Sequence, residues 1–218
     1  MRNSRRARAM EKGSKFGRDQ QEEVWQNAEV EALYRLSAAG VRVPEPYGVF
    51  DGVLVMELVI DAEGQPAPRL NNVLLEADEA RDHFRKMIRN IVRMLCAGLI
   101  HGDLSEFNVL VDSVGPVIID LPQAVDAAAN NNAERMLARD VRNITQYYAQ
   151  YAPELLKTNY HKEMWDLFKD GKLEPDTRLT GEFAEELHDA DVDGVMEEIK
   201  AVIAEEKARQ ERLNSADE

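Results

Sequence analysis

Three oxygen-bearing side chains lie in one short stretch of the sequence in a pattern suited to phosphoryl transfer. Asp103 is followed five positions later by Asn108, between an apolar helical run and a β-rich run, so that a carboxylate and an amide share one loop. Asp120 comes twelve residues after Asn108, at the end of a second apolar run. One Asp can orient or deprotonate an attacking hydroxyl, while an Asn and another Asp hold Mg²⁺ on nucleotide phosphates. Zn²⁺ would favour Cys or His clusters, and the sequence has none.

An Asp and an Asn at this spacing are a weak signal on their own, because loop residues of these types also cap turns. The wider pattern is more specific, since a Met-Glu-Leu run at 56–58 lies some 46 residues before Asp103 and Ile-Ile-Asp ends at Asp120. His101 directly precedes the loop. We interpret His101 as a packed scaffold residue that holds the loop backbone, rather than as a metal ligand or a general base.

The elements that must position these residues are predicted from hydrophobic periodicity and turn signals. Apolar residues recur at helical spacing over residues 18–39, and Gly40 then caps the helix. Asp51-Gly52 predicts a hairpin between Tyr47–Phe50 and Val53–Leu58. The rest is predicted in this order: a loop over 61–76, a helix over 78–97, β-rich runs at 109–111 and 117–119, a loop over 124–133, and helices from there on. This order favours an α+β domain over a doubly wound sheet.

Composition excludes several classes of protein. The chain has 218 residues, 44% hydrophobic and 31% charged, which suits one large or two small domains with a sizeable core. No apolar run reaches the length of a membrane span, and no apolar stretch follows the basic start, so we expect neither a membrane protein nor a secretion signal. Cys96 is the single cysteine, which favours a reducing, cytoplasmic compartment.

Charge is distributed unevenly along the chain, whose formal net charge is −14. Residues 1–18 carry seven basic side chains and one acidic one, whereas residues 174–218 carry fifteen acidic and five basic ones. The net charge argues against a general nucleic-acid binder, but the basic end is suited to contact phosphate, RNA or an acidic partner. The alternative is that the basic end is a solvated, flexible segment and that the acidic end is the solvent face of helices.

Four motifs, in order, resemble the catalytic core of the protein-kinase-like superfamily, and specifically the RIO family of atypical kinases. They are the hinge at Met56–Leu58 with the loop Gly64–Leu70 after it, the catalytic loop at His101–Asn108, the metal-binding segment at Ile119–Val125, and the next helix at Leu137–Ile144. The resemblance covers about residues 1–155. It implies a kinase-like α+β fold with a mainly helical C-lobe, and the alanine-rich, acidic composition favours a bacterial member.

The resemblance implies roles for the residues of the loop and the segment after it. Asp103 corresponds to the catalytic Asp, and Asn108 and Asp120 correspond to the residues that hold Mg²⁺ on ATP. Ser105 falls where RIO loops place a residue near the phosphates.

The resemblance also implies an adenine site and an ion pair. The hinge residues expected to bind the nucleotide, with the first in the gatekeeper position, are Met56, Glu57, Leu58 and Val59. Glu29 aligns with the helix glutamate that pairs with the ATP-binding lysine, and Glu31 is the alternative from the same alignment. An exposed helix glutamate with no such role is the other interpretation of Glu29.

A complete RIO domain begins with a glycine-rich loop and the strands that carry the lysine. Residues 1–17 contain neither, so we expect a truncated N-lobe made of a helix and a hairpin. The expected organisation is a basic flexible segment at 1–17, a partial N-lobe at 18–59, a C-lobe at 60–155, and an acidic helical region at 156–218.

The function implied is transfer of the γ-phosphoryl group of ATP to a Ser or Thr hydroxyl, on a protein substrate or on the chain itself. A close alternative is an ATPase switch that acts on a large partner such as a ribosomal particle, because no extended activation segment separates Asp120 from the next helix. A third is a non-catalytic truncated pseudokinase that binds RNA or protein through residues 1–18. Asp103→Ala separates them, because only a catalyst would lose ATP turnover.

Overall fold

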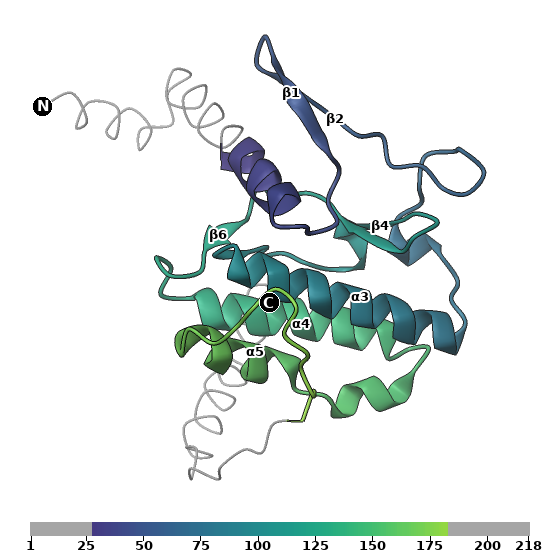
Figure 1. Cartoon of the computed structure of the whole chain (residues 1–218). Helices are drawn as coiled ribbons and strands as arrows, with labels where there is room; N and C mark the ends of the chain where they lie inside the picture. Colours follow the sequence, from purple (N-terminus) through teal and green to yellow (C-terminus); the bar gives the residue numbers. More distant parts are fainter. Residues whose placement is uncertain (1–27, 183–218) are drawn as a thin grey trace, which may run out of the picture. The chain divides into compact units, whose positions relative to one another are not determined.

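A β-hairpin and the helix at residues 28–38 lie on one side of the described structure, and the helices at residues 77–96, 133–148 and 160–169 lie on the other (Figure 1). The structure, a computed structural model, describes residues 28–182, and all of them belong to one compact unit. The predicted contacts of the basic segment 1–18, the start of the helix predicted over 18–39, and the acidic end after residue 182 lie outside the described residues.

Residues 28–38 form a helix, which confirms the first predicted helix over its described part. The helix is closed by Gly40, whose φ of 72° lies in the left-handed region. The N–H of Val41 then donates to the carbonyl of Leu36 at 3.0 Å, which satisfies one of the last helical carbonyls. Leu33 and Leu36 are buried, so this helix packs its apolar face into the core.

The predicted hairpin is confirmed as β1 (Pro46–Phe50) paired antiparallel with β2 (Val53–Met56). Asp51 and Gly52 have φ angles of 51° and 79°, as a two-residue turn with two left-handed positions requires. β2 ends at Met56 rather than at Leu58. The N–H of Glu57 still donates to the carbonyl of Glu45 at 2.8 Å, and the chain then leaves the hairpin, so that the carbonyl of Val59 accepts from the N–H of Ala67 at 2.9 Å.

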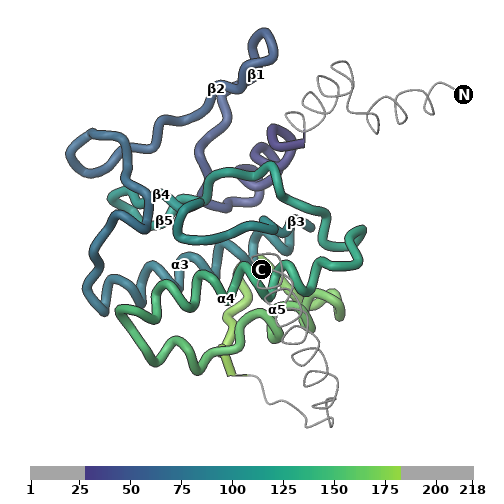
Figure 2. The backbone as a smooth tube through the Cα atoms, turned by 180° about the vertical axis from the view of Figure 1, so that it is seen from behind, coloured from purple at the N-terminus to yellow at the C-terminus, as the bar shows by residue number. Residues whose placement is uncertain are grey.

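The core lies among the helices α3 (Ala77–Cys96), α4 (Ala133–Tyr148) and α5 (Tyr160–Lys169), which run side by side in Figures 1 and 2. Phe84 of α3 joins the three helices, because its ring meets Tyr148 and Tyr160 edge-on at centroid distances of 6.0 and 5.7 Å. The hairpin contributes little to this core, since most of its side chains are exposed.

Two pairs of short strands lie between the hairpin and the helices. β4 (Val109–Val111) pairs antiparallel with β5 (Pro116–Ile118), which confirms the predicted runs with the second shifted by one residue. β3 (Leu99–Ile100) pairs antiparallel with β6 (Val125–Asp126). β6 lies inside the stretch that was predicted to be a loop, residues 124–133. Two-residue strands show no periodicity in the sequence, which is why this pair was not predicted.

The expectation that every residue after 133 is helical is wrong for residues 170–182. Gly171 has a φ of 67° and ends α5, and Pro175 follows it. The carboxylate of Glu163 accepts from the N–H of Thr180 and of Gly181, both at 2.9 Å, and so ties the irregular segment to α5. Three short 3-10 helices complete the described fold: η1 (Leu70–Asn72), η2 (Glu106–Asn108) and η3 (Pro153–Lys157).

The predicted α+β class is confirmed, with small antiparallel sheets and helices packed as a separate layer. None of the helices that the structure describes combines the length and the apolar character needed to cross a membrane.

Ile144→Ala tests where the stability of the fold resides. Ile144 of α4 is fully buried in the core, so its truncation should lower the free energy of unfolding by about 2–5 kcal/mol. Gln146→Ala, on the exposed face of the same helix, should change it by less than about 0.5 kcal/mol. Urea unfolding followed by circular dichroism measures both, and equal losses would contradict the assignment of the core.

Candidate active site

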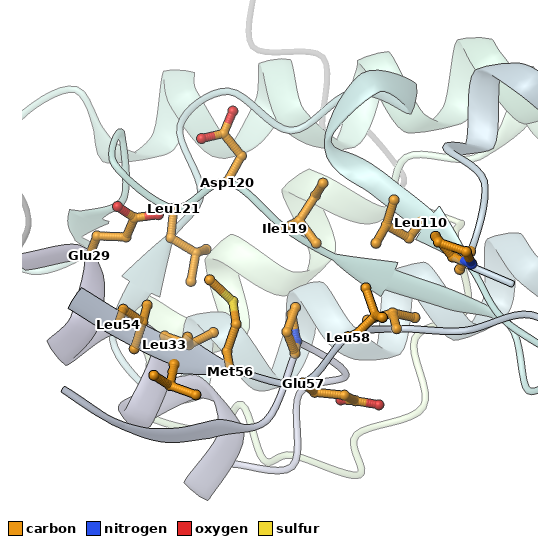
Figure 3. A pocket seen from close by; sticks show the side chains of 15 residues that line it. Glu29, Leu33, Leu54, Met56, Glu57, Leu58, Leu110, Ile119, Asp120 and Leu121 are labelled. Carbon is orange, nitrogen blue, oxygen red and sulfur yellow. The ribbon is translucent and has the colours of Figure 1, made fainter. Parts of the chain in front are cut away.

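An apolar pocket of about 610 Å³ lies between the hairpin and the layer of short strands (Figure 3). Its described lining comes from the helix at 28–38, Pro44, β2 with residues 57–59, Pro66 and Ala67, β4, and residues 119–121. Their apolar side chains include Leu33, Leu54, Val59, Leu110 and Leu121. A pocket with such walls suits a flat, largely apolar ring, with polar groups needed only at its edges.

Two carboxylates, those of Glu29 and Asp120, stand at one edge of this pocket (Figure 3). Burial, and to a lesser degree the negative charge of Asp120, raises the pKa of Glu29 above its ordinary value. Among the described residues, no Lys or Arg lines the pocket. Glu31, the alternative to Glu29, is exposed and does not line it. A cation at this edge would therefore face Glu29 and Asp120 together.

The predicted hinge, Met56–Val59, forms one wall of the pocket. Figure 3 shows the side chain of Met56 directed into the pocket and the carboxylate of Glu57 directed away from it. The N–H groups of Leu58 and Val59 have no hydrogen-bond acceptor among the described residues. Such N–H groups are available to a ligand that enters beside the hinge.

Arg42 anchors the hinge to the strand layer. Its guanidinium donates to Glu57 at 2.9 and 3.0 Å and to Asp112 at 2.7 Å. Its carbonyl accepts from the N–H of Ile118 in β5 at 2.9 Å, and its N–H donates to Asn90 of α3 at 3.2 Å. One residue thus connects the hinge, a β-turn, a strand and a helix, and it ties the hinge wall of the pocket to the strand layer.

These contacts shift the pKa values of both carboxyl groups. The hydrogen bond from Arg42 holds the pKa of Glu57 below its ordinary value of 4.5. Burial acts to raise the pKa of Asp112, but the bonds from Arg42 and from two backbone N–H groups lower it below its ordinary value of 3.8. Both carboxylates are therefore stabilised in their charged form.

The loop at residues 101–108 presents Asp103, Ser105 and Asn108. Gly102 is required at its start, because its φ is 82° and a Cβ there would lie 2.7 Å from the carbonyl oxygen of Gln123. The side-chain amide of Asn108 donates to the carbonyl of Asp103 at 2.9 Å, which closes the loop on itself. The carboxylate of Asp103 is exposed and has no hydrogen-bond partner among the described residues.

Asp140 of α4 holds this loop from below. Its carboxylate accepts from the N–H of Gly102 at 2.8 Å and from the N–H of Leu104 at 3.1 Å, on either side of Asp103. Arg139 donates to the carbonyl of Gly102, and Asn143 donates to that of Leu104 at 3.0 Å. Burial raises the pKa of Asp140, while the two N–H donors oppose that shift. Three polar side chains of one helix thus fix the backbone around Asp103.

His101 connects the loop to the segment that carries Asp120. Its ring is buried, with Nε2 3.0 Å from the carbonyl oxygen of Ile119 and Nδ1 3.3 Å from the N–H of Asp103. Nε2–H therefore donates and Nδ1 accepts, as in a neutral imidazole. This confirms the predicted scaffold role of His101. Asp120 itself has a φ of 67°, a conformation that Asp tolerates better than most residues.

The donor set at this place fits Mg²⁺. The side-chain nitrogen of Asn108 donates to the carbonyl of Asp103, so the side-chain oxygen of Asn108 remains available to a metal. The carboxylate of Asp120 is exposed and has no hydrogen-bond partner among the described residues. Within the described residues, no group of three or more His, Cys, Asp or Glu could form a metal cage. Mg²⁺ in phosphoryl-transfer sites needs no such cage, because one or two protein ligands are completed by phosphates and water.

The structure gathers the expected site residues into two neighbouring groups. The pocket is lined by Glu29, Met56, Glu57, Leu58, Val59 and Asp120, while Asp103, Ser105 and Asn108 lie on the loop and do not line it. The backbone bond from the N–H of Ile119 to the carbonyl of Asn108, at 3.0 Å, joins the two groups.

Arg42 and Asp140 support the site, and neither was assigned a role from the sequence. Asp140 could have been found, because it falls on the same helix face as Leu137, Val141 and Ile144, and a carboxylate on an apolar face requires a partner. Arg42 gives no such signal, since its partners lie 15 and 70 residues away.

Comparison with known proteins identifies relatives of this arrangement. The family model of the RIO domain matches residues 1–162. The chain is 42% identical over 126 residues to the RIO-type serine/threonine-protein kinase Rio1 of Haloferax volcanii, a match that covers 57% of this chain and 42% of that protein. It is 32% identical over 151 residues to the human serine/threonine-protein kinase RIO1, a match that covers 69% of this chain and 26% of that protein. The chain thus spans less than half the length of these curated relatives.

Arg42→Met tests the anchor of the hinge. At pH 7 the variant should lose about 1–2 kcal/mol of unfolding free energy, a modest amount because the ion pairs are partly exposed. The pKa values of Glu57 and Asp112 are lower in the folded state, so this contribution is complete above about pH 5 and is lost as the pH falls through the folded values. The difference between wild type and variant should therefore shrink towards pH 3.

Urea unfolding at pH 7, 5 and 3 measures this difference. Arg89→Met is the matched control, because Arg89 is exposed and makes no ion pair within the described residues. A stability difference that stays constant with pH would show that the charges of Glu57 and Asp112 are not what Arg42 stabilises.

Proposed function

The chain belongs to the RIO domain family, and we propose that it is an ATP- and Mg²⁺-dependent phosphotransferase that acts on serine or threonine hydroxyls. The observation that carries the proposal is the loop around Asp103, held rigidly beside an apolar pocket that has free N–H groups at its hinge. Catalysis of phosphoryl transfer depends almost entirely on such positioning and on stabilisation of charge, because the reaction requires little covalent chemistry from the protein itself.

The proposed role of Asp103 is to orient the attacking hydroxyl and to accept its proton. Its carboxylate is exposed, as access to a macromolecular substrate requires, while the backbone on both sides of it is fixed by Asp140. A fixed backbone with a free carboxylate suits a general base, which must meet the hydroxyl in one orientation. Asp140 supports Asp103 and does not itself face the substrate, because it is 2% exposed.

Asn108 and Asp120 would hold Mg²⁺ through their side-chain oxygens. Bound Mg²⁺ supplies charge that offsets the phosphate oxygens during transfer. The bond between Ile119 and Asn108 keeps the two ligand-bearing segments together. Ser105 directly precedes η2, between Asp103 and Asn108, and its proposed place near the phosphates rests on the resemblance to RIO loops.

The adenine ring would occupy the apolar pocket, with Met56 behind it and the N–H groups of Leu58 or Val59 as donors. Glu29 would pair with a lysine that binds the phosphates. We propose that residues 18–59 form the N-lobe part of this site and that residues 60–155 form the C-lobe part.

A second candidate function is an ATPase that switches a large partner. The short connection between Asp120 and α4, which begins at Ala133, favours it, because it leaves little room for an extended segment that binds peptides. Release of phosphate without transfer to protein would distinguish this function from the kinase function.

Asp103→Ala tests the proposal. The variant should keep micromolar binding of Mg-ATP in calorimetric titration but lose phosphoryl transfer by about 10²–10⁴-fold, the usual contribution of a general base. Asn108→Ala should instead weaken Mg-ATP binding, because it removes a metal ligand.

Asp51→Asn is the control, since it removes one carboxylate from the exposed turn of the hairpin and should change neither quantity. Transfer that survives in Asp103→Ala would refute the role of Asp103. Wild-type protein that is folded but binds no Mg-ATP would refute the nucleotide site.

A further inference from the structure

Three arginines of α4 line a second hollow, of about 480 Å³, which we name the α4 arginine pocket. Arg135, Arg139 and Arg142 are spaced by four and three residues, so they project from one face of the helix. All three are exposed. The other residues of the pocket, Asn132, Met136 and Ala138, carry no charge.

Two of the three arginines of this pocket lack an ion-pair partner within the described part of the chain. Neither Arg135 nor Arg142 makes an ion pair with a described carboxylate. Glu134, which directly precedes Arg135, lies 3.9 Å from Lys162 instead. Asp140, which directly follows Arg139, is buried, and its carboxylate accepts from the N–H groups of Gly102 and Leu104. Burial lowers the pKa of His161, and the charge of Arg142 lowers it further, so the field of this arginine reaches α5. In a chain with a net charge of −14, three such arginines on one helix face form a local concentration of positive charge.

The α4 arginine pocket borders the loop that carries Asp103. Arg139 donates to the carbonyl of Gly102, the residue immediately before Asp103. Met136, which lines the pocket, has its terminal methyl 2.7 Å from where a Cβ on Gly102 would lie. The pocket and the 101–108 loop therefore share a wall. A substrate segment whose hydroxyl meets Asp103 would carry its neighbouring residues over these arginines.

We propose that the α4 arginine pocket binds acidic or phosphorylated side chains that flank the acceptor hydroxyl of a protein substrate. The proposal rests on the proposed phosphotransferase function and names its substrate class. Guanidinium groups match the geometry of carboxylates and phosphates and form paired hydrogen bonds with them. The hollow takes the place of the extended peptide platform that is missing between Asp120 and α4.

The features of the pocket favour a peptide over a nucleic acid. Binding of single-stranded RNA combines a basic groove with aromatic side chains on which bases stack. Among the described residues, no aromatic side chain lines this pocket, and its volume suits one or two side chains rather than a polymer. The large negative net charge also opposes a long polyanion more than a short acidic segment.

Fluorescence anisotropy with the full chain tests the proposal. The probes are labelled peptides with one serine, flanked by Asp and Glu, by Asn and Gln, or by Lys. The acidic peptide should bind most tightly, and Arg135→Gln/Arg142→Gln should weaken its binding by roughly tenfold, as expected for two exposed charge contacts. Arg139 stays unchanged, because it holds the loop.

Arg85→Gln/Arg89→Gln is the matched control, because it removes the same number of exposed arginines from one helix. These two arginines lie four residues apart on α3, away from the pocket. This control should leave binding of the acidic peptide within twofold of wild type. In transfer assays, the α4 double variant should raise KM for the acidic peptide with little change in kcat, and it should leave ATP hydrolysis without peptide unchanged.

Equal binding of acidic and neutral peptides would overturn the proposal, and so would equal losses in the two double variants. A single-stranded RNA that displaces the acidic peptide more effectively than unlabelled peptide does would show that the pocket serves nucleic acid instead. If wild type binds the acidic peptide through these arginines but transfers no phosphate, the proposed function fails while the docking site stands.

Discussion

The arrangement of the site depends on one buried carboxylate, that of Asp140. A carboxylate that is 2% exposed is costly unless its oxygens accept hydrogen bonds, and the N–H groups of Gly102 and Leu104 provide them. The same bonds satisfy two loop amides that would otherwise point into the core. Because the donors flank Asp103, any movement of the loop would leave Asp140 unpaired. The packed helical layer, through Asp140, thereby holds the backbone that carries the exposed carboxylate of Asp103.

The other wall of the site is held by a different kind of contact. Arg42 is partly exposed and joins the hinge to the strand layer through Glu57 and Asp112, so its bonds exchange with water more easily than those of Asp140. The site thus combines a rigid loop, which is held by α4, with a more adaptable hinge, which lines the apolar pocket. This division suits a site in which the nucleotide must enter and leave while the base at Asp103 keeps its position.

Patterns that are local in the sequence predicted the fold well, whereas contacts between distant residues were not predictable. The hairpin followed from Asp51-Gly52 and α3 from its apolar face, because turn chemistry and helical period are local properties. The pairing of β3 with β6 has no periodicity to detect. The motif that contains Asp103 and Asn108 predicted the chemistry of the site, but the support from Arg42 arises only when segments 15 and 70 residues apart meet.

Hydrogen exchange at the amides of Gly102 and Leu104, in wild type and in Asp140→Asn, tests most directly whether Asp140 holds the loop. An asparagine offers one oxygen in place of two, so at least one of these amides should exchange about ten times faster or more, while core amides of α3 stay protected. Asp126→Asn is the control, because its carboxylate accepts from the N–H groups of Ala128 and Ala129 in an exposed turn. Equal protection of both loop amides in wild type and variant would contradict the account.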